Sequence, residues 1–534
     1  MRKVSVTILL SLLVLAIEGY AQTITGSMSG RVIDQQGAAV PNATVRATEP
    51  TKNTTNTVKT NDQGSFLFAG MQPGTYTVSI EAAGFKKLDR KNTQLDANDK
   101  LALGDITLQV GAVTESIEVS ATAATLQTES VDRSATINGK QVENIQVNGR
   151  NPLDMAKLIP GVVSTANVSA GGVGGLSGLA VNGNRGTSNQ LTINGVSDID
   201  TGANGSQNVT VSQDSMAEFK ILTGTYQAEY GRNAGAQISL VTKSGTDQFH
   251  GSGYWYHRHD DLNANTYINN VRGLNKPLFR YNDPGYTIGG PIYIPKFETK
   301  TKDKLFFFWS QEWQKQLLAN GIQNKTVPTA AERNGDFSAT RDNNHNLLTV
   351  LNDPLGGTFP NKIIPPSRFY GPGIAILKLY PLPNTDQVGY NYSSQISGQA
   401  PRREDLLRID SNITENVRVF GHWINNLQDN LSPYGSFVLG PTVPIANILD
   451  RRPGHSLAAG VTWIISPTMT NEANWGFTKN TIDITETTNV LRRATSGINL
   501  PVLYPSAIQD DYIPNLQFGG THTANSPTFV TNDA

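Results

Sequence analysis

Apolar and polar side chains alternate in short runs between residues 30 and 108. Phe66 and Phe68 alternate with smaller or more polar neighbours, and the next run places Tyr76, Val78 and Ile80 on one apolar face. Turn residues such as Gly37 and the Pro73–Gly74 pair separate the runs. Period-two patterning interrupted by Gly, Pro and Asn is typical of short antiparallel strands. Residues 22–110 are therefore predicted to form a small β-sandwich.

Residues 111–245 differ in character, because Gly, Asn and Ser become dense and the segments become short. Asn151 and Pro152 are a helix cap and a first-turn residue for a predicted helix over 153–159. Ser215 and Glu218 have capping-box spacing before residues 219–222 and indicate a second helix there. We therefore predict a linker over 111–125 and a mixed α+β domain over 126–245.

Alternation returns after Phe249 and now includes aromatic residues. One apolar face consists of Leu457, Ala459, Val461, Trp463 and Ile465, and a second of Met469, Ala473, Trp475 and Phe477. Residues 408–425 form a similar predicted hairpin around Thr414–Asn416. Such strands suit an antiparallel transmembrane β-barrel over 246–534, although a soluble β-sandwich would show the same alternation. Eight prolines between 328 and 383 predict that residues 323–403 form a long extracellular loop.

The N-terminus has the order of a secretory signal. Arg2 and Lys3 precede an apolar run over 4–17, and Gly19 and Ala21 supply small residues at a cleavage site. The run is too short to span a membrane as a helix. Residues 1–21 are thus predicted to be removed, which leaves an exported protein that begins near Gln22.

Composition narrows the class of protein further. The 534 residues include no cysteine, so disulfides and thiol chemistry are ruled out. A net charge of −1 gives no electrostatic reason to expect nucleic acid as a partner. Charged residues make up 16% of the chain, below the ~25% of ordinary soluble domains. The fold class expected is mainly β.

Four segments of the predicted sandwich resemble a known family. Residues 30–32, 60–66, 73–76 and 83–85 look like the carboxypeptidase regulatory-like domain, which has a transthyretin-type or Ig-like sandwich fold. A zinc carboxypeptidase would need a His with a Glu three residues later, and none of the seven histidines has one. The resemblance therefore implies the fold without peptidase activity.

A second resemblance covers the middle of the chain. Residues 148–151 and 193–196 resemble the plug domain of TonB-dependent outer-membrane receptors. The plug motif also includes Asn182, Gly183, Arg185, Glu229, Tyr230, Gly231 and Arg232. With a regulatory-like domain in front, the order is similar to the Oar-like subgroup. It implies an outer-membrane location, contact with outer-membrane lipid and an extracellular ligand.

The linker contains a segment that resembles a TonB box. Its residues are Glu115, Ser116, Ile117, Glu118, Val119, Ser120 and Ala121. Such a box pairs its backbone, as an added strand, with a TonB-type periplasmic energy transducer. The position favours a box, Ser120 replaces the family's usual Thr, and an ordinary linker strand is an equally consistent interpretation.

No catalytic, cofactor or metal site is predicted. His257, His259, Asp260 and Asp261 are close in sequence, but neighbours on a strand alternate faces and are not expected to meet at one ion. The glycine-rich run 171–178 lacks the Lys and Ser/Thr of a phosphate loop and is predicted to be a flexible loop. Nucleophile motifs are not found either. The protein is expected not to be an enzyme.

Two functions follow as hypotheses. The first is a plug-gated transporter energised by TonB, with the ligand and the direction of transport open. Residues 246–534 supply eight to ten strands by rough count, fewer than the ~22 of plugged transporters, so the barrel is expected to be incomplete. The alternative is an exported adhesion or surface-binding protein whose sandwich binds carbohydrate or protein, with Tyr76 and Phe85 as candidate stacking residues. Their alternation favours packing in the core instead.

Overall fold

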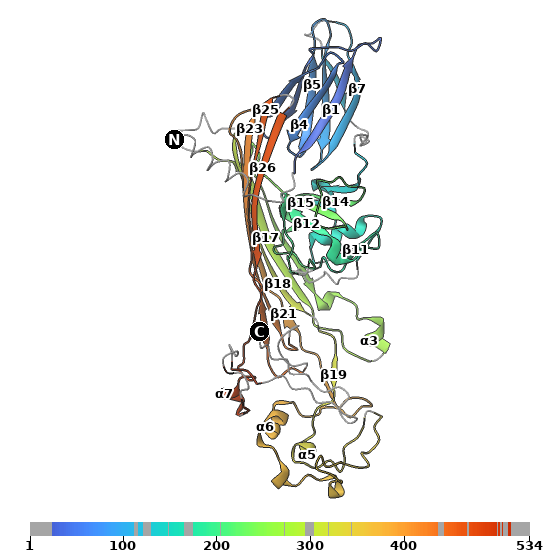
Figure 1. Ribbon diagram of the computed structural model, residues 1–534, viewed down its shortest axis with the longest axis vertical. Helices are drawn as coiled ribbons and strands as arrows, with labels where there is room; N and C mark the ends of the chain where they lie inside the picture. The colour runs from blue at the N-terminus through green and yellow to red at the C-terminus, as the bar shows by residue number, and fades with distance from the viewer. Residues whose placement is uncertain are drawn as a thin grey trace, which may run out of the picture.

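The protein has three parts along its length, followed by a small outer layer (Figure 1). The computed structural model describes residues 24–111, 116–120, 130–147, 149–164, 175–202, 204–271, 273–293, 304–318, 320–342, 344–435, 443–466, 469–498, 500–501, 505 and 511–513. The predicted signal segment 1–21 and residues 171–174 of the glycine-rich run lie outside these residues. Among the described residues, no helix is long and apolar enough to cross a membrane.

The N-terminal part is the predicted β-sandwich. One sheet has the order β4-β1-β7 and consists of β1 (Gly26–Ile33), β4 (Ser65–Met71) and β7 (Lys100–Thr107). The other has the order β3-β2-β5-β6-β8 and consists of β2 (Thr44–Glu49), β3 (Thr54–Lys59), β5 (Gly74–Glu81), β6 (Lys87–Leu95) and β8 (Ser116–Ser120). The inward positions of the alternating runs meet in one core that includes Phe66, Phe68, Val78 and Ile80.

Tyr76 belongs to that core. Its side chain is 1% exposed, and its hydroxyl donates a hydrogen bond to the Gln72 carbonyl at 2.7 Å. Phe85 also packs against the core from a partly buried position. The core interpretation of these two rings is therefore confirmed, and neither ring forms an open stacking platform.

We expect Tyr76→Ala to destabilise the sandwich by about 3–5 kcal/mol, because the change leaves a ring-sized cavity in a packed core. Hydrogen exchange of the β5 and β2 amides in the complete chain would measure the loss. Thr75→Ala is the matched control, since the neighbouring Thr75 side chain is exposed. Equal exchange rates in the two variants would contradict the core assignment.

The second part is a compact α+β domain. Its five-stranded sheet has the order β13-β12-β15-β14-β9 and consists of β9 (Arg133–Asn138), β12 (Gln190–Ile193), β13 (Val196–Ser197), β14 (Met216–Gly224) and β15 (Gln237–Thr242). Short elements surround it: α2 (Gly139–Asn144), η1 (Pro152–Leu158), the hairpin of β10 (Val162–Ser164) and β11 (Leu179–Val181), η2 (Gly186–Ser188) and η3 (Gln213–Ser215).

Two local predictions for this domain have different outcomes. The helix after Asn151 exists as a 3-10 helix, and the Asn151 side chain accepts a hydrogen bond from the Leu153 amide at 3.0 Å. The helix predicted over 219–222 is wrong, because these residues lie in β14 between β9 and β15. The Ser215 hydroxyl bonds to the Ser212 carbonyl rather than capping a helix, and Ser212 caps η3.

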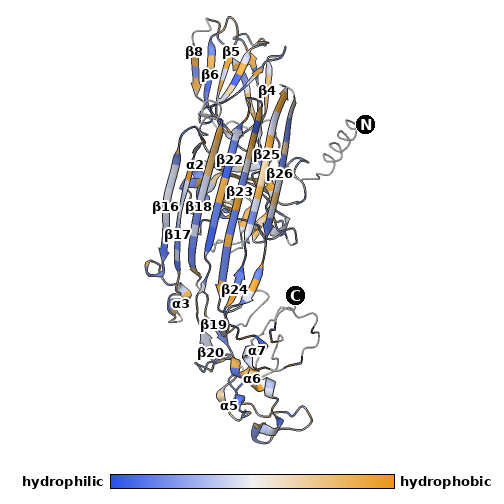
Figure 2. Ribbon diagram, turned by 90° about the vertical axis from the view of Figure 1, so that its left-hand side faces the viewer, coloured by the Kyte–Doolittle hydropathy of each residue, from blue (hydrophilic) through white to orange (hydrophobic). Residues whose placement is uncertain are grey.

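The third part is a ten-stranded antiparallel sheet, and most of its strands are long. It consists of β16 (His250–His259), β17 (Arg280–Pro291), β18 (Leu305–Leu318), β21 (Gly398–Gln399), β22 (Arg402–Asn412), β23 (Val417–Ser432), β24 (Ile448–Arg451), β25 (Gly454–Ser466), β26 (Met469–Asn480) and β27 (Asp483–Glu486). Figure 2 shows the long strands side by side, with hydrophobic and hydrophilic positions mixed along each one. Within the described residues the sheet stays open, since β16 and β26 each pair on one side.

The predicted alternation of this sheet is confirmed. In β25, Ala458 and Thr462 are buried, whereas Trp463 is 50% exposed. Trp475 and Phe477 of β26 are exposed on the same outer side. The predicted turn Thr414–Asn416 joins β22 to β23, which pair from Arg402↔Gln428 to Asn412↔Arg418. One face is apolar and open, and the other covers the two preceding domains.

The proline-rich stretch forms an outer layer with structure of its own. It contains β19 (Gln323–Lys325), α5 (Ala330–Arg333), η5 (Pro360–Lys362), η6 (Pro366–Arg368), α6 (Gly371–Leu379) and β20 (Tyr392–Ser394), and its core is shared with residues near α7 (Arg493–Ser496). Figure 1 places α5 and α6 at the end of the molecule opposite the sandwich. Close to this end, β16 continues into η4 (Asp260–Leu262) and α3 (Tyr267–Val271).

Candidate functional site: the contacts that hold the plug

The α+β domain lies against the inner face of the long sheet and shares a core with it. Phe308, Leu406 and Ile424 of the sheet pack with Leu191, Phe219 and other buried residues of the domain. The approach is close at two glycines. A Cβ on Gly476 would lie 2.3 Å from the Val196 side chain, and one on Gly454 would lie 2.2 Å from the Asn208 carbonyl. Only glycine permits this approach of backbone to domain.

A group of charged side chains, all buried except the partly buried Asp214, joins the two parts. We call it the plug–barrel cluster; its members are Arg150, Asp214, Asp283, Glu312, Arg402 and Glu404. Arg150 comes from the α+β domain and forms an ion pair with Asp214 of η3. Its Nε lies 3.2 Å from Asp283 Oδ2 on β17. One arginine thus bridges the domain and the sheet.

Two tyrosines of β16 cover the same guanidinium. The Arg150 Cζ lies 3.9 Å from the Tyr256 ring centroid and 5.2 Å from that of Tyr254. The Tyr254 hydroxyl donates a hydrogen bond of 2.9 Å to Glu312, which also pairs with Arg402 at 3.2 Å. Removing the cation from such a group would leave carboxylates buried without a partner, which is costly.

Further polar contacts between the domain and the sheet come from β22. Glu404 accepts hydrogen bonds from the Ser212 amide and from the Thr210 hydroxyl, the latter at 3.3 Å. Arg408 donates to the Thr242 carbonyl at 3.0 Å and to Asn194 Oδ1 at 3.2 Å. Contacts of this kind are satisfied without covalent links, so they can break and re-form together.

The sandwich is attached to the same domain through a second buried contact. We call it the sandwich–plug contact; its members are Ala97, Asp99, Glu218 and Lys220. The Ala97 amide donates to both Glu218 oxygens, at 3.0 and 3.1 Å. Lys220 Nζ donates to Asp99 at 2.5 Å and to the Ala97 carbonyl at 2.6 Å. The Glu218 and Lys220 side chains both project from β14.

The carboxylate of this contact is held in an unusual state. Burial, followed by the charge of the nearby Asp96, raises the pKa of Glu218 to about 8. The pKa of Asp96 is raised as well, by burial and by Asp99. Three carboxyl groups face a single ammonium here, so the contact favours a protonated Glu218.

The predicted plug-motif residues lie in turns. Asn182 and Gly183 have positive φ angles of 50° and 78°, and the Asn182 amide donates to the Thr223 carbonyl at 2.6 Å. Arg185 precedes η2 and is exposed. The segment Glu229, Tyr230, Gly231 and Arg232 is a largely exposed turn between β14 and β15. The motif is therefore not brought together as one site.

The TonB-box-like segment is only partly described. Glu115 and Ala121 lie outside the described residues, whereas Ser116, Ile117, Glu118, Val119 and Ser120 form β8. This strand pairs in parallel with β6 of the sandwich, from Lys87↔Ser116 to Lys91↔Ser120. Asn148, the first residue of the neighbouring motif, also lies outside the described part.

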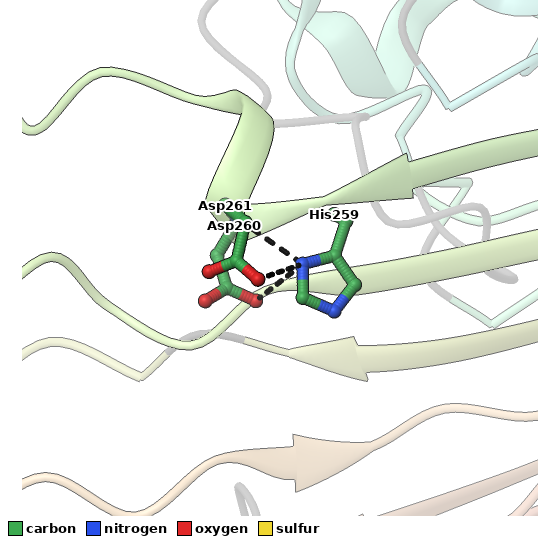
Figure 3. A group of neighbouring side chains, drawn as sticks. All are labelled: His259, Asp260 and Asp261. Atoms are coloured by element: carbon green, nitrogen blue, oxygen red, sulfur yellow. Dashed lines mark hydrogen bonds and ion pairs between the residues drawn. The ribbon is translucent and has the colours of Figure 1, made fainter.

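The histidine–aspartate group near 260 differs from the prediction in its geometry. β16 ends at His259 and the chain turns into η4, so one ligand atom each from His259, Asp260 and Asp261 lies within 4.8 Å of the others (Figure 3). The premise that strand alternation separates them is therefore wrong. The His259 Nδ1 already accepts a hydrogen bond from the Asp261 amide at 3.1 Å. This explains the arrangement as a cap of η4.

Comparison with known families completes the description. Residues 241–534, more than half of the chain, match the family "Outer membrane beta barrel domain". Residues 27–109 match "Carboxypeptidase regulatory-like domain", and residues 125–236 match "TonB-dependent Receptor Plug Domain". The chain belongs to the TonB-dependent receptors, in their Oar-like form. The receptor resides in the outer membrane.

One curated relative and several solved structures are similar to the receptor. It is 28% identical over 305 residues to the TonB-dependent transporter Oar of Myxococcus xanthus, which covers 54% of this chain and 26% of the relative. The chain thus spans about a quarter of that protein's length. The outer membrane transporter YddB of Escherichia coli overlays with a TM-score of 0.39 at 9% identity, covering 64% of this chain and 38% of that one. A mutant ferric enterobactin receptor (PfeA) of Pseudomonas aeruginosa gives 0.39 at 11%, covering 65% and 41%. Scores this low carry no argument about function.

Proposed function

We propose that this receptor moves a ligand across the outer membrane by displacing its plug. The observation that carries the proposal is the plug–barrel cluster, which adds ion pairs and hydrogen bonds to the apolar core that the folded domain shares with the barrel wall. Such contacts are strong in place, yet the domain remains a separate unit whose local stability can be lower than that of the barrel. A ligand could then pass where the domain had been.

The two ends of the molecule suit two separate roles. The outer layer around α5 and α6 is proposed to meet the extracellular ligand, because loops on a rigid scaffold commonly carry recognition. Residues 115–121 are proposed to bind a TonB-type transducer in the periplasm by strand addition. The exposed Trp463, Trp475 and Phe477 would contact outer-membrane lipid. No covalent chemistry is required of any residue.

Deleting residues 115–121 tests the proposal directly. We expect the deletion to abolish energised uptake and leave binding of the ligand to whole cells unchanged, since the outer layer lies at the other end of the molecule. Uptake and binding of the same labelled ligand would be compared in cells that make the complete protein. A control variant replaces residues 35–38, an exposed turn of the sandwich, with a Gly/Ser segment of equal length. Undiminished uptake by the deletion variant would reject residues 115–121 as the transducer-binding segment. Binding without energised uptake by the unaltered receptor would favour surface binding over transport.

A further inference from the structure

The position of β8 bears on when the transducer can reach the TonB-box-like segment. The strand lies beyond the family match of the regulatory-like domain, which ends at residue 109, yet it is built into that domain's sheet. It occupies the edge next to β6, the last strand of the domain's own four in that sheet. The sandwich therefore holds a segment that belongs functionally to the transducer contact.

Both backbone and side chains of the segment are engaged. One set of its backbone groups pairs with β6 over Ser116–Ser120. Ile117 lies beside Leu88 in register and is half-buried, and Leu88 itself is in the sandwich core. A partner that adds a strand needs backbone groups for affinity and alternate side chains for specificity. The Ile117 side chain is therefore partly covered by the sandwich and is less available to such a partner.

The pairing of β8 with β6 is nevertheless weak enough to be reversible. It extends over five residues, and its ion pair joins Lys91 Nζ to Glu118 Oε1 at 2.7 Å between side chains that are 48% and 62% exposed. An exposed pair of this kind stabilises by at most about 1 kcal/mol. Val119 at the end of the strand is 45% exposed and adds little burial.

We propose that the edge of β6 on which β8 lies is a reversible docking site for residues 116–120, and that this edge competes with the TonB-type transducer for the segment. The proposal rests on the proposed function and adds regulation to it. The sandwich keeps the segment paired until it is released, so the receptor presents its box only part of the time. A change that loosens the sandwich edge raises the affinity for the transducer, and one that tightens it lowers that affinity.

The absence of cysteine from the sequence makes a clean test available. Asp89 and Glu118 are paired in register on the outer face, and neighbouring strands lie ~4.8 Å apart, within reach of a disulfide. The double variant Asp89→Cys/Glu118→Cys is made in the complete chain, and the pair Asp89→Cys/Gln109→Cys, with its second site beyond β7, is the control. The probe is the purified periplasmic domain of the source cell's TonB-type transducer, and its Kd is measured with and without reductant.

We expect the first pair to cross-link spontaneously and the control pair to stay reduced. The oxidised first variant should bind the probe at least tenfold more weakly than its reduced form, and reductant should restore binding. Failure of the cross-link to form would overturn the docking of the segment on β6. Equal binding by oxidised and reduced protein would show that the transducer adds to the outer edge of β8, which overturns the competition alone. If the reduced and wild-type proteins both fail to bind, the box assignment itself falls and the proposal falls with it.

Discussion

Replacing Arg150 by methionine is expected to loosen the plug by about 3–5 kcal/mol, the cost of leaving buried carboxylates without their cation. The guanidinium is 6% exposed and serves Asp214, Asp283 and two tyrosine rings at once. Methionine keeps most of the volume and removes the charge. The plug amides of η1 and β12 should then exchange hydrogen roughly two to four powers of ten faster, as measured by mass spectrometry on the complete protein.

Two companion variants make this result specific. Arg232→Met changes an exposed plug arginine whose guanidinium donates one hydrogen bond to Asn204, and we expect little effect. Asp283→Asn in the Arg150→Met background should recover part of the loss, because a neutral amide is cheaper to leave in that position. If Arg150→Met and Arg232→Met behave alike, the plug–barrel cluster does not hold the plug.

The attachment of the sandwich to the plug is expected to weaken as pH rises from about 5 to 8. Glu218 has a pKa of about 8 in the contact, against an ordinary value near 4.5 when the contact opens. The closed state therefore binds more protons than the open state between these two pKa values. The stabilisation of the closed contact is fully present below pH 4.5 and is lost as the pH rises toward 8. One linked proton changes the closing equilibrium by up to tenfold for each pH unit. The groups that face Glu218 are Asp96, Asp99 and Lys220.

Thiol labelling can measure this opening. Ala97→Cys places a thiol at the buried contact, where the Ala97 side chain is inaccessible while the contact is closed. Its maleimide labelling rate is divided by that of the exposed control Gln109→Cys, which removes the intrinsic effect of pH on thiols. We expect the ratio to rise with pH in the wild-type background and to be nearly flat with Glu218→Gln. A flat ratio in both backgrounds would exclude Glu218 as the titrating group.

Period-two patterning was enough to predict the sandwich and the barrel strands, because each has one apolar face and one face of different chemistry. It failed at β14, because both faces of this strand are buried and every residue from Phe219 to Leu222 is inaccessible to solvent. A run of that kind has no alternation, and the Ser215–Glu218 spacing then suggests a helix that the sheet overrides. The prolines between 323 and 403 correctly marked irregular chain, but the small core around Ile376 and Tyr380 has no periodic signal.

The charged residues that hold the plug were harder to predict. Arg150 stood within a plug-like motif, but its partner Asp283 lies on β17, far along the chain, and a single sequence does not pair the two. One signal was present, since charged residues at inward positions of barrel strands need buried partners. The parallel pairing of β8 with β6 had no signal in the sequence. Parallel strands are joined by a long crossover, so no short turn marks them as partners.

The edge position of β9 in the plug sheet has a mechanical consequence. The chain runs from β8 through residues 121–132 into β9, which pairs with β14 on one side only. Tension applied at β8 would load β9 before any other plug strand, and detaching an edge strand leaves the β13-β12-β15-β14 order of the sheet intact. The plug would then unfold from its N-terminal end, beginning with β9. A path would open before the rest of the domain unfolds.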